Sequence, residues 1–183
     1  MKKNTAKRVA FIGILAALVY VTSAFLQIPI PTAIGNTRLH FGNVMCLLSG
    51  LLLGPVSGGL AAGIGSMFFD LTNPAYITSA PFTFVFKFLM AFLCGIIAHH
   101  TGKERTWKYV LAALLGAALY VVLYLSKSFI EDHFVLGIGL DVVWVTVTQK
   151  GVVSIVNGVI AAVVSVPLYL ALRPSLQKFR LLP

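Results

Sequence analysis

The stretch TRLHFGNVMCLLSGLLLGPVSGGLAAGIGSMFFD, residues 37–70, decides the fold of this chain. It contains two short apolar runs, residues 40–53 and 56–69, on either side of a Gly54-Pro55 pair that favours a turn. If both runs cross a bilayer, the two ends of the stretch return to the same membrane face. The polar residues stand near those ends, so the stretch predicts a binding site on one face. These residues are Arg38, His40, Asn43 and Asp70.

The composition indicates an integral membrane protein. The chain is 58% hydrophobic and only 10% charged, whereas a soluble domain carries about 25% charged residues. A membrane helix needs roughly 20 apolar residues, so 183 residues hold about six spans and little else. We therefore predict an all-α fold, with residues 1–183 forming a single six-helix membrane domain. The expected spans are residues 9–25, 40–53, 56–69, 81–98, 107–126 and 142–172.

The positive charges orient these spans. Six spans place both termini on one side, where most of the basic residues then gather, as is typical of cytoplasmic loops. They are Lys2, Lys3, Lys7, Arg8, Lys103, Arg105, Lys108, Arg173, Lys178 and Arg180. The net charge of +9 therefore reflects topology, with both termini cytoplasmic, rather than nucleic-acid binding.

Four cations depart from this rule and fall in outer loops or in the outer halves of spans. Ionisable residues within a membrane usually face a cavity or a partner, so these four are candidates for a binding site. They are Arg38, Lys87, Lys127 and Lys150. For Lys87, two interpretations remain open: its ammonium reaches along its apolar stem to the surface, or it points into a cavity toward an anionic or carbonyl-bearing ligand.

The last predicted span carries one polar or small stripe among Val, Ile and Leu. Its members recur at spacings of three and four and therefore share a helix face. They are Thr146, Lys150, Ser154, Asn157, Ala161 and Ser165. In a membrane such a face must lie against protein or a water-filled cavity, with Gln149 and Lys150 near the outer end and Asn157 deeper.

The first outer loop, QIPIPTAIGNT at residues 27–37, contains prolines and a Gly-Asn pair that disfavour helix. Its isoleucines are too apolar for a freely solvated loop, so we expect the loop to pack onto the spans. It is either a lid over an outward-facing pocket or an ordinary ordered connection.

Glycines four apart in residues 50–63 favour close packing between helices.

The chain resembles the substrate-binding S component of an energy-coupling factor (ECF) vitamin transporter. The resemblance lies in the basic N-terminus, the Pro-rich first outer loop, the run HFGNVMCLLSGLLLGPVSGGLAAGIGSMFFDL at residues 40–71, and PFTFVFK at residues 81–87. It implies a non-enzymatic subunit that captures a scarce water-soluble vitamin in a prokaryotic plasma membrane. The ligand is then expected near the outer face, under the first loop and among the ends of the later helices.

The resemblance also implies partners. Uptake is expected to require a transmembrane coupling subunit and two cytoplasmic ATPase subunits, so ATP is used by the partners and no cofactor is expected in this chain. The family docks its first helix through an Ala-xxx-Ala type motif. The nearest equivalents here are Ala10, Gly13 and Ala17, with Ile14 four residues after Ala10.

The candidate substrate-binding residues combine the charged and polar positions of the outer half. They are Arg38, His40, Asn43, Asp70, Lys87, Lys127, Gln149, Lys150 and Asn157. Lys87 and Lys150 have no acid nearby in sequence, which favours an anionic ligand because charge-assisted hydrogen bonds are strong.

The sequence also shows no dense aromatic cluster near the site for a flavin or a pterin. Phe41, Tyr76, Phe82, Phe84 and Trp144 are the aromatic residues that could contribute. Pantothenate is therefore the expected ligand, also because the HFGNVMCLL-type block resembles members associated with that vitamin. A hydroxymethylpyrimidine or pyridoxine-like ligand is the alternative.

Two other classes of protein remain as alternatives. A stand-alone secondary transporter is expected to carry ionisable residues through both membrane halves or an inverted repeat, yet the inner halves of these spans contain almost no charge. An intramembrane enzyme needs a nucleophile with a base, a metal set or clustered acids.

Cys46 and Cys94 are isolated in apolar runs and are expected to be small buried side chains.

Overall fold

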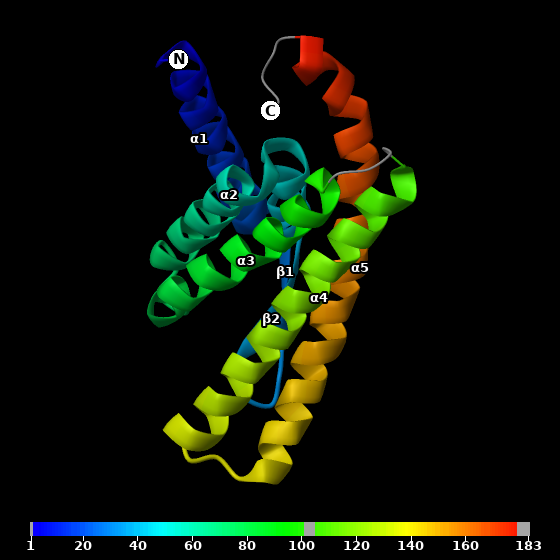
Figure 1. The fold of residues 1–183 in the computed structure, drawn as a ribbon. Helices are drawn as coiled ribbons and strands as arrows, with labels where there is room; N and C mark the ends of the chain where they lie inside the picture. Colours follow the sequence, from blue (N-terminus) through cyan, green and yellow to red (C-terminus); the bar gives the residue numbers. More distant parts are fainter. Residues whose placement is uncertain (1, 101–104, 179–183) are drawn as a thin grey trace.

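The computed structural model describes residues 2–100 and 105–178, which are almost entirely helical (Figure 1). The long helices are α1 (Lys2–Phe25), α2 (Gly42–Leu71), α3 (Ala80–His99), α4 (Thr106–Ile130) and α5 (Leu140–Lys178). Strands β1 (Gln27–Pro31) and β2 (Asn36–His40) form an antiparallel hairpin, and two short helical turns, η1 (Ile77–Ser79) and η2 (Glu131–Val135), precede α3 and follow α4. The helical class is confirmed. The loop expected at residues 27–37 is instead largely a β-hairpin.

Within these described ranges, five helices are long and apolar enough to cross a membrane, where the sequence predicts six spans. The difference lies in α2, which is a single element of 30 residues but is not straight. Gly54 has a φ of 76°, a left-handed conformation that favours glycine, and Pro55 follows it. The Cys46 Sγ atom lies 3.6 Å from the Ser66 Oγ atom, whereas an unbroken helix would separate them by about 30 Å. The predicted turn at Gly54-Pro55 is therefore confirmed.

Glycines let the backbone of α2 approach the backbones of α1 and α3 closely. A Cβ atom at Gly50 would lie 2.4 Å from the Ala91 carbonyl oxygen of α3, and one at Gly65 would lie 2.3 Å from the Ala16 carbonyl oxygen of α1. These close approaches make α2 the most buried helix of the five. The predicted role of the glycine spacing in close packing is confirmed, and the packing is within this chain.

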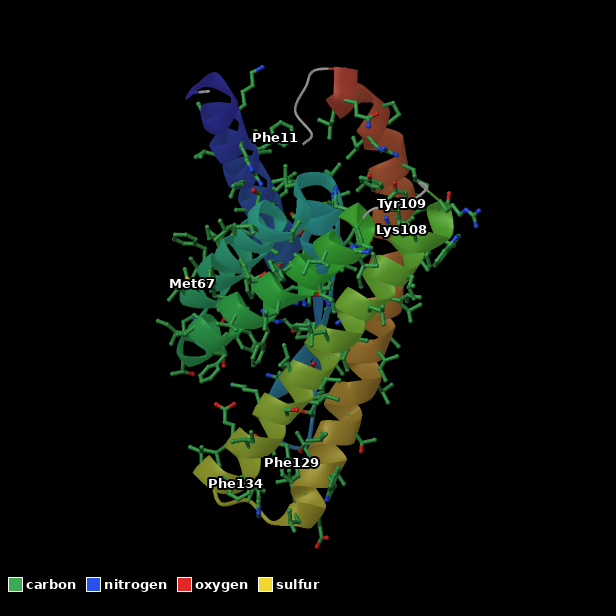
Figure 2. All side chains as sticks on the ribbon, viewed as in Figure 1. Phe11, Met67, Lys108, Tyr109, Phe129 and Phe134 are labelled. Carbon is green, nitrogen blue, oxygen red and sulfur yellow. The ribbon has the colours of Figure 1, made fainter. Side chains whose placement is uncertain are left out.

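The molecule has two distinct ends. The start of α1 and the end of α5 lie at one end, and the hairpin tip and the α4–α5 connection lie toward the other (Figure 1). Lys108 and Phe134 mark these two ends in Figure 2. Arg8 donates to the Ser57 hydroxyl at 2.6 Å, so the Gly54 turn lies at the end that holds the start of α1.

The predicted stripe on the last span is confirmed. Thr146, Ser154, Asn157, Ala161 and Ser165 are all buried on one face of α5. The opposite face exposes large apolar side chains such as Val152 and Val163, as is typical of a surface that contacts lipid. Because the polar face turns inward, α5 contributes a wall to any cavity in the bundle.

Candidate functional site

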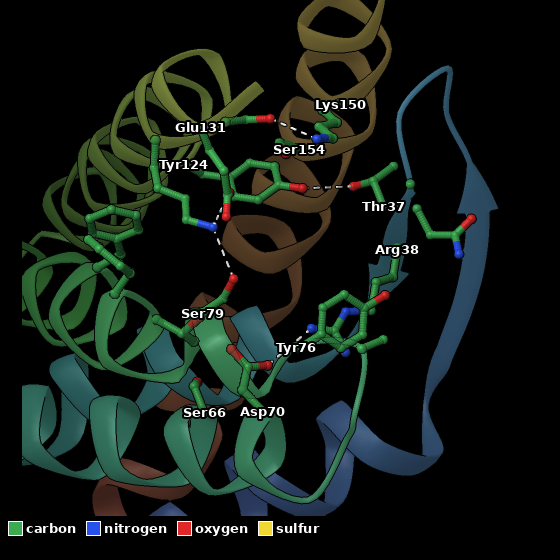
Figure 3. A pocket seen from close by; sticks show the side chains of 18 of the residues that line it. Thr37, Arg38, Ser66, Asp70, Tyr76, Ser79, Tyr124, Glu131, Lys150 and Ser154 are labelled. Atoms are coloured by element: carbon green, nitrogen blue, oxygen red, sulfur yellow. Dashed lines mark hydrogen bonds and ion pairs between the residues drawn. The ribbon is translucent and has the colours of Figure 1, made fainter. Parts of the chain in front are cut away.

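A cavity of about 390 Å³ lies near the hairpin end of the molecule (Figure 3). Its walls come from the hairpin, the end of α1, the second limb of α2, the segment with η1 before α3, helices α3, α4 and α5, and η2. Its volume falls within the range of about 300–1,000 Å³ that is typical of small-molecule sites. The cavity is therefore the candidate functional site.

One wall of the cavity is built around Arg38 of β2. The Arg38 Nη2 atom lies 3.3 Å from the Asp70 Oδ1 atom at the end of α2. The guanidinium carbon of Arg38 also lies 3.8 Å from the centroid of the Tyr76 ring and 4.4 Å from that of Phe69. The cation is thus held by a carboxylate and by two aromatic rings.

The facing wall contains two further ion pairs. Lys127 forms an ion pair with Glu131 and donates to the Ser79 hydroxyl at 2.9 Å. Lys150 of α5 donates to the Ser128 hydroxyl at 2.7 Å, and its Nζ atom lies 3.4 Å from the Asp132 carboxylate, which is buried.

Lys150 therefore has an acidic neighbour in space, although no acid lies near it in sequence, and the preference for an anionic ligand loses its support at Lys150. The turn η2 directly follows α4 and keeps Asp132 on the side that faces α5, where Asp132 also accepts a hydrogen bond from Ser128. The contact between Asp132 and Lys150 joins residues from two different elements. Spacing along the chain therefore did not reveal it.

The buried part of the cavity is polar. Lys87 is only 3% exposed; its ammonium donates to the Asn43 side-chain oxygen and lies 3.5 Å from the centroid of the Tyr120 ring. Within the described residues, the His40 Nδ1 and Asn43 Nδ2 atoms are buried and have no hydrogen-bond partner. His40 ends β2, before α2 begins. Burial, together with the positive charges of Lys87 and Arg38, lowers the pKa of His40 well below its usual value.

Side chains of α5 and α4 attach the hairpin to the bundle. The Asn157 oxygen accepts from the His40 backbone N–H at 3.0 Å, and the Asn157 amide nitrogen donates to the Arg38 backbone oxygen at 2.6 Å. Near the hairpin tip, Gln149 accepts from the Ala33 backbone N–H at 2.9 Å. The Thr37 hydroxyl also contacts the Tyr124 hydroxyl of α4 at 3.4 Å (Figure 3). The first outer loop is thus an ordered wall of the cavity.

Comparison with known proteins supplies the identity. Residues 3–174 match the family described as "ECF-type riboflavin transporter, S component". The chain belongs to this family. It is therefore a substrate-binding subunit of a membrane vitamin transporter, a multi-pass plasma-membrane protein and not an enzyme. A protein of Pyrococcus woesei, described as an "Uncharacterized protein in gap 3'region", is 33% identical over 112 residues, which cover 61% of this chain and 72% of that protein.

The predicted site residues of this S component all lie near the same end. Asn43 lies behind Lys87 and Gln149 holds the hairpin tip, so neither lines the cavity. The other seven line it: Arg38, His40, Asp70, Lys87, Lys127, Lys150 and Asn157.

The expectation that the S component lacks an aromatic cluster near the site is wrong. Among the residues that the structure describes, six aromatic ones line the cavity: Phe69, Tyr76, Phe82, Phe86, Tyr120 and Tyr124. Four of them form pairs spaced i, i+4 on α3 and α4, and such pairs share a helix face. The i, i+4 spacing of these aromatic residues is the feature of the sequence that could have predicted the cluster. Of the aromatic residues considered from the sequence, Phe41, Phe84 and Trp144 do not line the cavity.

Proposed function

We propose that this S component captures a planar aromatic vitamin in the cavity beside the hairpin, with riboflavin as the first candidate. The observation that carries this proposal is the aromatic lining from α2, α3, α4 and the loop before α3. Aromatic rings favour stacked or edge-on contacts with a planar ligand. The description of the family, which names riboflavin, agrees with this ligand class.

The preference for pantothenate depended on an anionic ligand for Lys87 and Lys150, on the lack of an aromatic cluster and on the resemblance of the HFGNVMCLL-type block, and the first two grounds are weakened. The cavity is rich in aromatic side chains, and Lys150 has a carboxylate neighbour in Asp132. The family description does not name pantothenate. Pantothenate, hydroxymethylpyrimidine and pyridoxine are therefore the competing ligands in the binding test.

We also propose that both limbs of α2 cross the membrane, which gives six spans with both termini cytoplasmic. Lys7 and Arg8 near the start of α1, and Lys108 near the start of α4, lie toward the end opposite the hairpin tip. Basic residues on one side support this orientation. Two of the basic residues used in the sequence argument, Lys103 and Arg180, lie outside the described residues.

The proposed partners are a transmembrane coupling subunit and two ATPase subunits, which would hydrolyse ATP while this chain carries no cofactor. Ala10, Gly13 and Ala17 are exposed on α1, and a Cβ atom at Gly13 would meet nothing within 4 Å. This small-residue face supports close docking of another helix. We propose it as the surface that contacts the coupling subunit.

The test is thermal unfolding of the purified protein in detergent with each of the four vitamins. A ligand at 100 times its dissociation constant stabilises the folded state by about 2.7 kcal/mol. Riboflavin should raise the Tm, and Tyr76→Ala should reduce the increase. Trp107→Ala, which removes an exposed aromatic side chain outside the cavity, is the matched control.

A Tm increase with pantothenate alone would contradict the aromatic ligand class. The absence of an increase with all four vitamins would contradict vitamin capture by this cavity. Uptake of the vitamin into vesicles by the purified chain alone, without ATPases, would contradict the proposed partners.

A further inference from the structure

The charges around the cavity are unevenly balanced. Among the described residues, each acid that lines the cavity has a cation within 4.0 Å. The pairs are Asp70 with Arg38, Glu131 with Lys127, and Asp132 with Lys150. Lys87 is the remaining lysine of the lining, and no carboxylate of the described residues lies within 4.0 Å of it. Lys87 is therefore a cation of the cavity that forms no ion pair with the part of the chain that the structure describes.

Lys87 does not reach the surface, because it is only 3% exposed. The interpretation in which its ammonium extends to the membrane surface is therefore wrong. An ammonium carries three donors and no acceptor. The Asn43 oxygen and the Tyr120 ring occupy two directions around it, which leaves one donor for the cavity that Lys87 lines.

One neighbour of Lys87, Asn43, also has a side-chain atom without a hydrogen-bond partner among the described residues. The Asn43 Nδ2 atom is a buried donor without a hydrogen-bond partner among the described residues, although its own oxygen is used by Lys87. Leaving a buried donor unpaired costs free energy, and an uncompensated buried charge costs more. Both groups are donors, but only Lys87 lines the cavity, so a ligand group that pairs with Lys87 must be an acceptor.

We propose that Lys87, which Asn43 holds from behind, forms an acceptor-binding subsite in the cavity and takes a carbonyl or carboxylate oxygen of the ligand. For riboflavin this oxygen is a ring carbonyl, and for pantothenate it is the carboxylate. The inference rests on the proposed function, because it requires the ligand to enter this cavity. It separates Lys87 from the three cations that already have carboxylate partners.

The experiment compares dissociation constants for riboflavin, measured by titration of the purified protein in detergent. Lys87→Met removes the charge and the donors, and Lys87→Gln removes the charge but keeps a donor. Loss of a charge-assisted hydrogen bond should weaken binding by about 10-fold to 100-fold. Lys7→Met changes an exposed lysine near the start of α1, away from the cavity, and serves as the matched control.

A second measurement separates binding from folding. A buried charge without a carboxylate partner costs free energy in the folded state, and an apolar side chain of similar size removes that cost. The ligand-free Lys87→Met protein should therefore have a Tm no lower than that of the wild type, although its affinity for riboflavin falls. If Lys87→Met does not fold, the affinity of Lys87→Gln for riboflavin tests the subsite instead: a fall in affinity supports it and an unchanged affinity refutes it.

The outcomes distinguish the two proposals. If the wild type binds riboflavin and both Lys87 variants bind it within about threefold of the wild type, the subsite is refuted and vitamin capture stands. An equal loss of riboflavin affinity in Lys7→Met also refutes the subsite, because the affinity would then depend on the net charge of the protein and not on the position of Lys87. If the wild type binds none of the four vitamins, the proposed function fails and the subsite fails with it.

Discussion

Replacing Asn157 with alanine should detach the β-hairpin from α5. Asn157 is 5% exposed, and its side chain makes two hydrogen bonds with the backbone of β2, at 3.0 Å from the His40 N–H and at 2.6 Å to the Arg38 oxygen. Each such bond contributes about 0.5–1.5 kcal/mol, and each backbone group left buried without a partner costs about 1–3 kcal/mol. We therefore expect a loss of about 2–4 kcal/mol of stability.

Amide hydrogen exchange of the purified protein in detergent measures this effect where it occurs. The peptide that contains His40 should exchange at least about tenfold faster in Asn157→Ala, since each 1.4 kcal/mol corresponds to about a factor of ten. The affinity for the ligand should also fall, because β2 carries Arg38 into the cavity wall. Gln149→Ala is the matched control, because it removes a single exposed bond to Ala33 near the hairpin tip.

Gln149→Ala should therefore change the stability by no more than about 1 kcal/mol. Unchanged exchange of residues 36–40 in Asn157→Ala would refute the reasoning, because it would mean that β2 stays in place without its contacts to α5. An equal acceleration in both variants would also refute it, because the hairpin would then depend on its tip rather than on Asn157.

Three further predictions concern packing, pH and docking. Gly50→Ala places a Cβ atom 2.4 Å from the Ala91 oxygen and should lower stability by about 1–3 kcal/mol, whereas Gly13→Ala, which meets nothing within 4 Å, should not lower the Tm. Because the pKa of His40 is lowered in the folded protein, its contribution to stability is complete above about pH 6.5 and decreases as the pH falls toward the folded-state pKa. His40→Gln should therefore reduce the loss of Tm between about pH 7 and about pH 5. Ala17→Trp on the exposed face of α1 should leave vitamin binding by the isolated chain unchanged but abolish uptake by the assembled transporter, and unchanged uptake would contradict docking through α1.

The features that the sequence predicted correctly depend on local chemistry. The turn at Gly54-Pro55 follows from the conformational freedom of glycine and the rigidity of proline. The buried stripe on α5, which includes Asn157, follows from helical periodicity in a chain that must hide polar groups from lipid. Neither feature requires knowledge of which helices are neighbours.

The features that the sequence missed depend on contacts between distant segments. The hairpin pairs Gln27 with His40, although the prolines of β1 disfavour a strand; β1 has β2 as a partner on one edge only, where prolines are tolerated. The contact between Asp132 and Lys150 requires η2 to carry the acid toward α5. These contacts are set by tertiary structure, so spacing along the chain did not reveal them.

The packing of α2 explains why the site forms at one end. The turn at Gly54 brings the polar start of α2, at Asn43, and its acidic end, at Asp70, to the same end of the molecule. The approach of Gly50 to Ala91 then fixes α3 against the first limb of α2, which sets the height at which Lys87 meets Asn43. A side chain at Gly50 would force these helices apart. It should therefore weaken ligand binding as well as stability, even though Gly50 does not line the cavity.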